Sequence, residues 1–318
     1  MTIILLGMNI NQRIIAVAIA AIFGVNLSMA QQIAEVSPNG QTTMYQTLQK
    51  AVEGAVNGSV IYLPAGGFQI PDSVKITKKV SIVGVGHSAT TDNADGNTVI
   101  SGNLFFNSGS NCSTVIGCYI SGTVYIGKDG KSVNNIVVKY CNIGNVDVNN
   151  STCTGTVINQ SYLRNGSGFN GASATLMNNV INNVNGLTGG IVANNVFVNG
   201  SGFSNCSVYQ NIFINGQGLG GNVSFGNMAK SDVGDSPVNI GELTWDDLFV
   251  KFNNGGVTPA SDFQIKDGYK EQYKGCGLGR DFRRNGQPPM PFFIAKTVPG
   301  QTDASENLNI KVRVKSGE

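Results

Sequence analysis

Short apolar segments recur between residues 111 and 215, each accompanied by an asparagine- or glycine-rich corner. Six of them read VIGCYI, VKYCNI, VINQSY, LMNNVI, VANNVF and YQNIF. The spacings are 23, 19, 19, 16 and 16 residues when these positions are taken as equivalent: Cys118, Cys141, Gln160, Asn179, Asn195 and Asn211. A copy of this length holds about one strand and one corner, and it cannot bury its apolar face without neighbours. The pattern therefore predicts a solenoid of stacked strands.

The same alignment predicts which side chains form the interior. Successive side chains of a strand point to opposite faces, so aligned apolar residues should stack inside the solenoid. The residues expected to point largely inward are Ile116, Ile120, Val138, Ile143, Ile158, Val180, Val196 and Ile212. Asn179, Asn195 and Asn211 predict an internal ladder of amide hydrogen bonds at a bend. The alternative is a row of asparagines that binds sugar.

The segments that flank the repeats predict four regions of the chain. Residues 31–57 read as a polar leader and a short cap helix, because apolar residues recur at helical spacing from Tyr45 to Ala55. The parallel β-helix is expected over residues 58–265, followed by a C-terminal extension over 266–318. This extension either packs along the solenoid or mediates attachment. It ends in a predicted strand pair, residues 292–298 and 308–314.

The N-terminal region, residues 1–30, has the pattern of a secretory signal peptide. Arg13 supplies positive charge, an apolar run follows from Ile14 to Val25, and Ser28-Met29-Ala30 is a small-x-small cleavage site. We expect cleavage after Ala30 and export to the periplasm, the cell surface or the medium. An uncleaved anchor is the alternative, but the run is shorter than the ~20 residues that a membrane span needs.

Composition agrees with stacked strands and argues against nucleic acid as a partner. Charged residues make up 13% of the chain and glycine occurs 42 times in 318 residues. Ordinary domains carry roughly 25% charge and about 7% glycine. Glycine and asparagine tolerate the left-handed backbone of tight corners. The formal net charge is only +2, and the repeats contain no long basic stripe of the kind that binds nucleic acid.

The six cysteines and the single histidine offer little chemistry. Export would permit disulfides, but Cys118 and Cys141 fall at the same repeat position. Their Cβ vectors would be parallel in a stacked column, which is poor geometry for a bridge. Buried free thiols are therefore the favoured interpretation. His87 follows a glycine corner and is expected on a solvated loop.

Residues 47–86, TLQKAVEGAVNGSVIYLPAGGFQIPDSVKITKKVSIVGVG, resemble the entry of right-handed parallel β-helix proteins of the pectin-lyase-like superfamily, of the exported bacterial type. In that family a helix caps the open end, and a strand, a corner and a second strand follow. The matching positions are Ser59, Ile61, Leu63, Gly66 and Phe68, then Lys78, Val80, Ser81, Ile82 and Gly84. The resemblance implies an all-β fold: a right-handed parallel β-helix with an N-terminal helical cap and a C-terminal extension.

The resemblance also implies a candidate reaction, cleavage of an acidic polysaccharide. Lyases of the family need an acidic calcium cluster and an arginine or lysine base, whereas hydrolases need two or three close carboxylates. Between residues 96 and 231 the only acids are Asp129 and Asp147. Lys139 and Asp147 lie near one rung, and Arg164 lies one rung further on. This set is thin, and a solvated face explains it better than a catalytic site.

Metal and sugar ligands each have one further candidate. Asp92-Asn-Ala-Asp95-Gly96 is rich in oxygen ligands like a calcium loop, but it lacks the alternating ligand run and the distal glutamate. No other cofactor is expected. Tyr162 is a candidate stacking platform for a sugar, and the alternative is that it belongs to the core.

The sequence therefore favours an exported, non-catalytic β-helix that binds a polysaccharide or a cell-surface component, as a monomer. The alternative is a polysaccharide lyase or glycoside hydrolase, supported by the family resemblance alone. The missing carboxylates decide between these two hypotheses.

Overall fold

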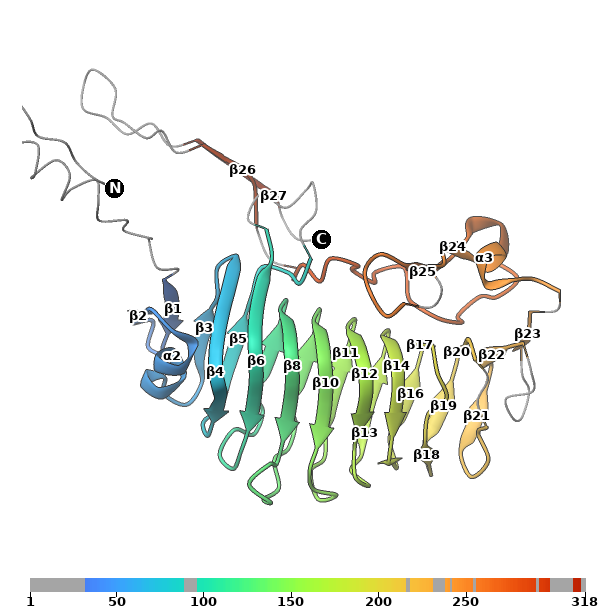
Figure 1. The fold of residues 1–318 in the computed structure, drawn as a ribbon, viewed down its shortest axis with the longest axis horizontal. Helices are drawn as coiled ribbons and strands as arrows, with labels where there is room; N and C mark the ends of the chain where they lie inside the picture. The colour runs from blue at the N-terminus through green and yellow to red at the C-terminus, as the bar shows by residue number, and fades with distance from the viewer. Residues whose placement is uncertain are drawn as a thin grey trace, which may run out of the picture.

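The computed structural model describes residues 32–88, 96–215, 218–230, 238–240, 242–253, 256–289, 292–297 and 311–315. Within them the chain forms a parallel β-solenoid of about eight turns, with two long sheets as its walls (Figure 1). The predicted parallel β-helix is confirmed. The expected signal peptide and the two calcium candidates, Asp92 and Asp95, lie outside the described residues.

The first sheet has eleven strands in the order β2-β1-β3-β5-β7-β9-β11-β13-β16-β19-β21. Every pair is parallel except those of β1, which runs antiparallel to both neighbours. The strands are β1 (Ile33–Val36), β2 (Thr42–Tyr45), β3 (Ser59–Tyr62), β5 (Val80–Val83), β7 (Thr114–Ile116), β9 (Val137–Lys139), β11 (Thr156–Asn159), β13 (Ala174–Met177), β16 (Ile191–Ala193), β19 (Ser207–Tyr209) and β21 (Val223–Phe225).

The second sheet has ten strands in the order β23-β22-β20-β17-β14-β12-β10-β8-β6-β4, and all of its pairs are parallel. The strands are β4 (Gly66–Ile76), β6 (Thr98–Phe106), β8 (Tyr119–Ile126), β10 (Asn142–Val148), β12 (Tyr162–Gly168), β14 (Val180–Asn185), β17 (Val196–Phe197), β20 (Ile212–Phe213), β22 (Met228–Ala229) and β23 (Val238–Asn239). A small parallel pair joins β15 (Leu187–Thr188) to β18 (Phe203–Ser204).

The N-terminal end of the solenoid is capped by helix α2 (Leu48–Gly54). The Thr47 side chain accepts a hydrogen bond from the N–H of Lys50 and so satisfies one of the free donors of the first turn. The helix buries Leu48, Ala51 and Val52 against the core. Lys78 donates to the carbonyl oxygens of Glu53 and Ala55. Its positive charge stabilises the helix C-terminus, which carries a partial negative charge.

The predicted asparagine ladder is confirmed and extends by one rung. Each Nδ2 donates to the Oδ1 of the next asparagine at 2.9–3.0 Å, along Asn179, Asn195, Asn211 and Asn227. The first three are fully buried, so they are not a row that binds sugar. The register also corrects one equivalence. The residue aligned with Cys141 and Asn179 is Ser161, not Gln160, because the Ser161 hydroxyl accepts from Cys141 N–H and its own N–H donates to Asn179.

Half of the residues expected in the interior point elsewhere. Ile120, Val138, Ile143 and Ile158 lie in the main core as expected. Ile116 is half-buried and points outward, and its neighbour Val115 is inside. Val180, Val196 and Ile212 are fully buried, but in a second cluster on the outer side of the second sheet. The repeat alignment located the strands correctly, but it did not show which side chains of each strand point inward and which point outward.

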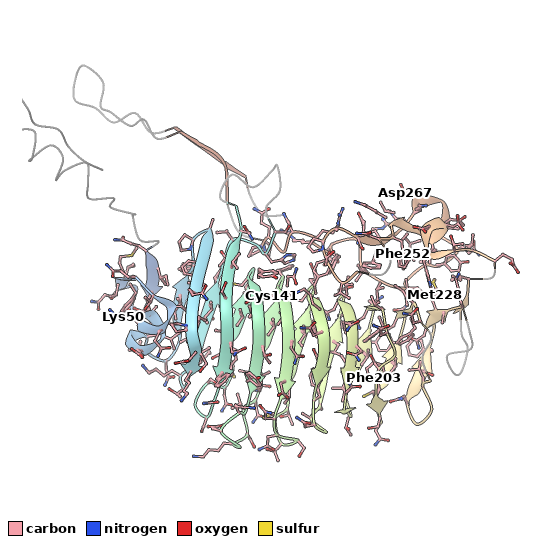
Figure 2. All side chains as sticks on the ribbon, in the orientation of Figure 1. Lys50, Cys141, Phe203, Met228, Phe252 and Asp267 are labelled. Atoms are coloured by element: carbon pink, nitrogen blue, oxygen red, sulfur yellow. The ribbon has the colours of Figure 1, made fainter. Side chains whose placement is uncertain are left out.

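The second cluster is covered by residues 242–253 and 256–274, called the extension from here on, which pack along the solenoid. Its elements are α3 (Trp245–Leu248), β24 (Phe249–Lys251), β25 (Asp262–Ile265) and η1 (Asp267–Tyr269). Strands β24 and β25 pair antiparallel in a sheet of their own, so residues 262–265 do not close the solenoid. Figure 2 shows Phe252, which packs against this cluster, above Met228, which belongs to it.

A strap, defined as residues 275–288, continues from the extension back along one corner of the solenoid (Figure 1). The strap binds successive corners in reverse order. Its hydrogen bonds join Gly277 to Gln210, Gly279 to Asn178, Asp281 to Gln160, and Asn285 to His87. Strands β26 (Phe292–Thr297) and β27 (Lys311–Lys315) then form an antiparallel pair, close to the predicted positions.

The cysteines are free, as the favoured interpretation expected. Cys112 is exposed and the other five are buried. Burial raises the pKa of the Cys141 thiol to about 12, so this group stays protonated and unreactive at neutral pH.

Candidate functional site

The three charged candidates occupy different parts of the solenoid. Lys139 ends β9 on the outer face of the first sheet, whereas Asp147 and Arg164 lie on β10 and β12 of the second sheet. Asp147 accepts hydrogen bonds from the amide groups of Asn149 and Asn170, at 3.2 and 3.5 Å. Within the described part of the chain, no hydrogen bond or ion pair joins the three candidates to one another.

Tyr162 is a core residue, the alternative interpretation for this position. Its side chain is 1% exposed, and its ring makes edge contacts with His87 and Phe282, each with 5.4 Å between ring centroids. Burial raises the pKa of the Tyr162 hydroxyl well above its usual range, although nearby Arg284 opposes the shift. The ring therefore has no free face on which a sugar could stack.

A hollow of about 500 Å³ opens beside Tyr162 on the outer face of the second sheet. Its floor carries Val99, Tyr119 and Asn142, which are successive register partners on β6, β8 and β10. The next residue in this column is the buried Tyr162. Thr258 and Pro259 of the extension form one wall. The remaining lining residues are His87, Ser88, Asn97 and Arg164.

Arg164 is held over the hollow by two contacts. Its guanidinium carbon lies 4.8 Å from the centroid of the Tyr119 ring, and its Nη2 donates to the carbonyl oxygen of Ser121 at 3.4 Å. Tyr119 is two rungs away from Arg164. The intervening strand β10 has Gly144 at the adjacent position, where no side chain obstructs the reach. A cation over an aromatic face is stabilised by about 0.5–1 kcal/mol at an exposed site, which favours this rotamer of Arg164.

Several polar atoms around the hollow lack partners. Asn142 is 4% exposed, yet its Oδ1 accepts no hydrogen bond from any described residue. The same holds, within the described residues, for the Nε donor of Arg164 and both ring nitrogens of His87. Buried polar atoms almost always find a partner in the protein, in bound water or in a ligand. Beside the hollow, an acceptor and a charged donor are therefore buried without a hydrogen-bond partner among the described residues.

His87 is not the solvated loop residue that the sequence suggested. Its side chain is 3% exposed because the strap crosses it. The backbone N–H of His87 donates to the carbonyl oxygen of Asn285 at 2.8 Å. Burial lowers the pKa of the His87 imidazole to about 3. The ring is therefore neutral at physiological pH and forms an uncharged wall of the hollow.

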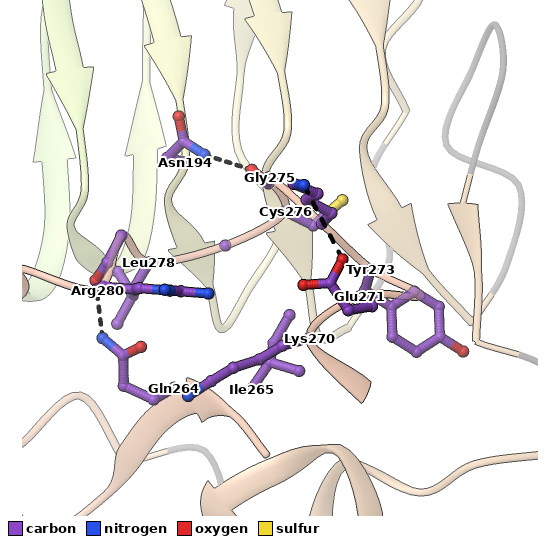
Figure 3. Close-up of a pocket in the computed structure, with 13 residues that line it drawn as sticks. Asn194, Gln264, Ile265, Lys270, Glu271, Tyr273, Gly275, Cys276, Leu278 and Arg280 are labelled. Atoms are coloured by element: carbon purple, nitrogen blue, oxygen red, sulfur yellow. Dashed lines mark hydrogen bonds and ion pairs between the residues drawn. The ribbon is translucent and has the colours of Figure 1, made fainter. Parts of the chain in front are cut away.

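A second hollow, of about 480 Å³, lies between the extension and the strap (Figure 3). Its polar groups bind one another. Gln264 donates to the carbonyl oxygen of Gly279, and Asn194 donates to that of Gly275. Lys270 pairs with Asp267 outside the hollow. With these amide groups already paired, this hollow offers a ligand fewer free amide partners than the first one does.

The described side chains that line the first hollow do not provide the acidic groups that glycoside hydrolysis needs. Its described lining residues include no aspartate or glutamate, so they cannot supply the acid and base of a glycoside hydrolase. In the described part of the chain, no three His, Cys, Asp or Glu side chains gather as metal ligands would. Nor does any described helix have the length and apolar character needed to cross a membrane.

Comparison with known proteins gave no match: no family model, no curated protein and no solved structure matches this chain. Any functional conclusion therefore rests on its own residues. Of the sequence candidates that the structure describes, only Arg164 lines the hollow. Tyr119 and Asn142 were missed, although both occupy the outward phase of strands that the repeat had located. The wall formed by Thr258 and Pro259 has no signal in the sequence, because it arises from a contact across more than a hundred residues.

Proposed function

We propose that this protein is an exported β-helix protein of the pectin-lyase-like kind that binds a carbohydrate without cleaving it, and that one sugar unit occupies the hollow. The observation that carries the proposal is the pair of unsatisfied groups, Asn142 Oδ1 and Arg164 Nε, beside the apolar surface of Tyr119 and Val99. A sugar hydroxyl is both donor and acceptor, so neighbouring hydroxyls can satisfy both groups once a side-chain movement uncovers these two enclosed atoms. The carbon–hydrogen face of the ring suits the apolar floor.

The charge of Arg164 favours an acidic sugar. Arg164 forms no ion pair with any described residue, and stacking on Tyr119 fixes its position before a ligand binds. A guanidinium binds a carboxylate through charge-assisted hydrogen bonds, which are roughly twice as strong as neutral ones. A uronate or another anionic sugar is therefore preferred over its neutral analogue.

Arg164→Ala is expected to weaken binding at least tenfold, because it removes a charge-assisted hydrogen bond of about 1.5–3 kcal/mol. A glycan array with neutral and acidic polysaccharides identifies the ligand for the mature protein. Calorimetry then compares the variants on the best one. Lys139→Ala is the matched control, since it removes a positive charge from the other sheet and should leave affinity unchanged.

Catalysis is tested on the same samples by following new unsaturated ends during incubation with acidic polysaccharides. We expect none. Release of unsaturated products that Arg164→Ala abolishes would instead support the polysaccharide lyase and refute the non-catalytic proposal. If no glycan on the array retains the protein, carbohydrate binding itself is refuted.

A further inference from the structure

The outer face of the first sheet is almost free of charge. Each strand presents about two outward side chains, and those of successive strands form two columns along the solenoid. The strands of this sheet contain two charged residues, Glu35 and Lys139. Glu35 is 4% exposed and faces the interior, so Lys139 is the single charge among the outward residues of these strands. We call the two columns the flat face.

Several apolar side chains of the flat face are open to solvent, although Val83 and Ala193 within it are buried. Tyr62 near one end is 42% exposed, and Ile191, Val223 and Phe225 in the later turns are 40–70% exposed. Tyr209 and Phe225 stack with parallel rings 4.9 Å apart. The extension covers the outer side of the second sheet, and its cluster includes no outward residue of the first sheet. Parallel sheets are normally covered on both faces, and exposed apolar side chains gathered on one nearly uncharged face indicate an interaction site.

We infer that the flat face binds the same face of a second copy of this chain. Eleven strands at about 4.8 Å spacing make a face roughly 50 Å long and, with two side chains across, roughly 12 Å wide. Two copies would bury on the order of 1,200 Å², which is the lower end for a specific interface. A partner must be flat and uncharged along this whole length, and an identical sheet meets both conditions.

The position of Lys139 is compatible with one arrangement of the pair. Lys139 belongs to the column beside the corner that Tyr140 begins. A two-fold axis parallel to the solenoid sets each column against the other column of the partner, so Lys139 lies opposite Val137 of the second copy. The two lysines are then on opposite edges of the interface. Each stem can lie along the apolar surface while its ammonium group reaches water.

This pair differs from the monomer expected from the sequence, and it is independent of the proposed sugar site. The hollow lies on the second sheet, so pairing of the first sheets leaves both hollows open. The modest area indicates a dissociation constant in the micromolar range, and the equilibrium should therefore depend on protein concentration.

Sedimentation velocity of the mature protein, from about 1 to 100 µM, tests the inference. The wild type should shift from monomer to dimer across this range. Val157→Lys and Ile191→Lys, on β11 and β16 of the flat face, should each weaken the dimer at least tenfold. Asn185→Lys is the matched control, because it adds the same charge at an exposed position on the second sheet and should change nothing.

Circular dichroism and thermal melting establish that each variant is folded. The two face variants lie on different strands, so if one of them fails to fold, the other still tests the interface. A wild type that stays monomeric at the highest concentration would overturn the inference without any variant. A dimer that resists both lysines would place the contact on another surface and would overturn it equally.

Discussion

Replacing Val196 by aspartate is expected to lower the free energy of unfolding by several kcal/mol and to release the C-terminal extension from the solenoid. Val196 is fully buried on the outer side of β17, between Val180 and Ile212 in the register. Gly277 of the strap packs against this column. A carboxylate here would be an unpaired charge in an apolar contact, which costs several kcal/mol unless the contact opens.

The effect of Val196→Asp shows whether the Val196 side chain points outward or into the solenoid. An aspartate inside the solenoid would unfold the sheets themselves, whereas at this position the sheets should persist while the extension detaches. Urea unfolding measures the loss of stability, and limited proteolysis measures exposure of residues 242–289. Asn185→Asp, at an exposed position of β14, the strand that pairs with β17, is the control and should cost little. Loss of all β-structure in the Val196 variant would contradict the prediction.

The solenoid could be predicted from the sequence because its signal is local and repeated. The ladder of Asn179, Asn195 and Asn211 needs the same residue at the same position in every turn, so the spacing of 16 residues is visible directly. The error at Gln160 has a physical reason. Gln160 and its equivalents Asn178 and Asn194 are corner residues with positive φ, a conformation that amide side chains tolerate. Two adjacent amide positions therefore repeat together, and the sequence alone does not show which one is inside.

The site could be predicted only in part because it depends on which outward residues are covered. Tyr119, Asn142, Tyr162 and Val180 occupy one outward column, yet the first two line the hollow and the last two are buried. The difference comes from what packs over each residue: Phe282 of the strap and His87 cover Tyr162, whereas Thr258 and Pro259 of the extension only border the hollow. Nothing in the local pattern around Tyr162 reports that distant contact. For this reason Tyr162 and Tyr119 could not be told apart from the sequence.

Acidification is expected to destabilise the docked strap through His87. Burial lowers the pKa of this imidazole to about 3 in the folded protein, whereas it is about 6.5 in an unfolded chain. Below pH 6.5 the unfolded state therefore binds more protons than the folded state, and stability falls as pH decreases toward 3. At pH 4.5 the loss amounts to about 2.5 kcal/mol, since each pH unit in this window is worth about 1.4 kcal/mol.

The pH window isolates His87 from the carboxylates. Hydrogen bonds from Thr244 lower the pKa of Asp247, and Lys270 lowers that of Asp267, so both groups lose their stabilising effect only below their usual range near pH 4. His87 is the single histidine of the chain. Urea unfolding at pH 7.5 and at pH 4.5 therefore reports mainly on this one ring.

His87→Phe is the decisive variant for this prediction. Phenylalanine keeps an aromatic ring against Tyr162 but cannot bind a proton, so its stability should change little between the two pH values while the wild type loses about 2.5 kcal/mol. Because Asn285 and Gly286 of the strap pack on His87, the wild type should also become sensitive to protease within the strap at pH 4.5. An equal loss of stability in both proteins would contradict the prediction. It would show that protonation of His87 does not cause the loss and that the acid-sensitive contact lies elsewhere.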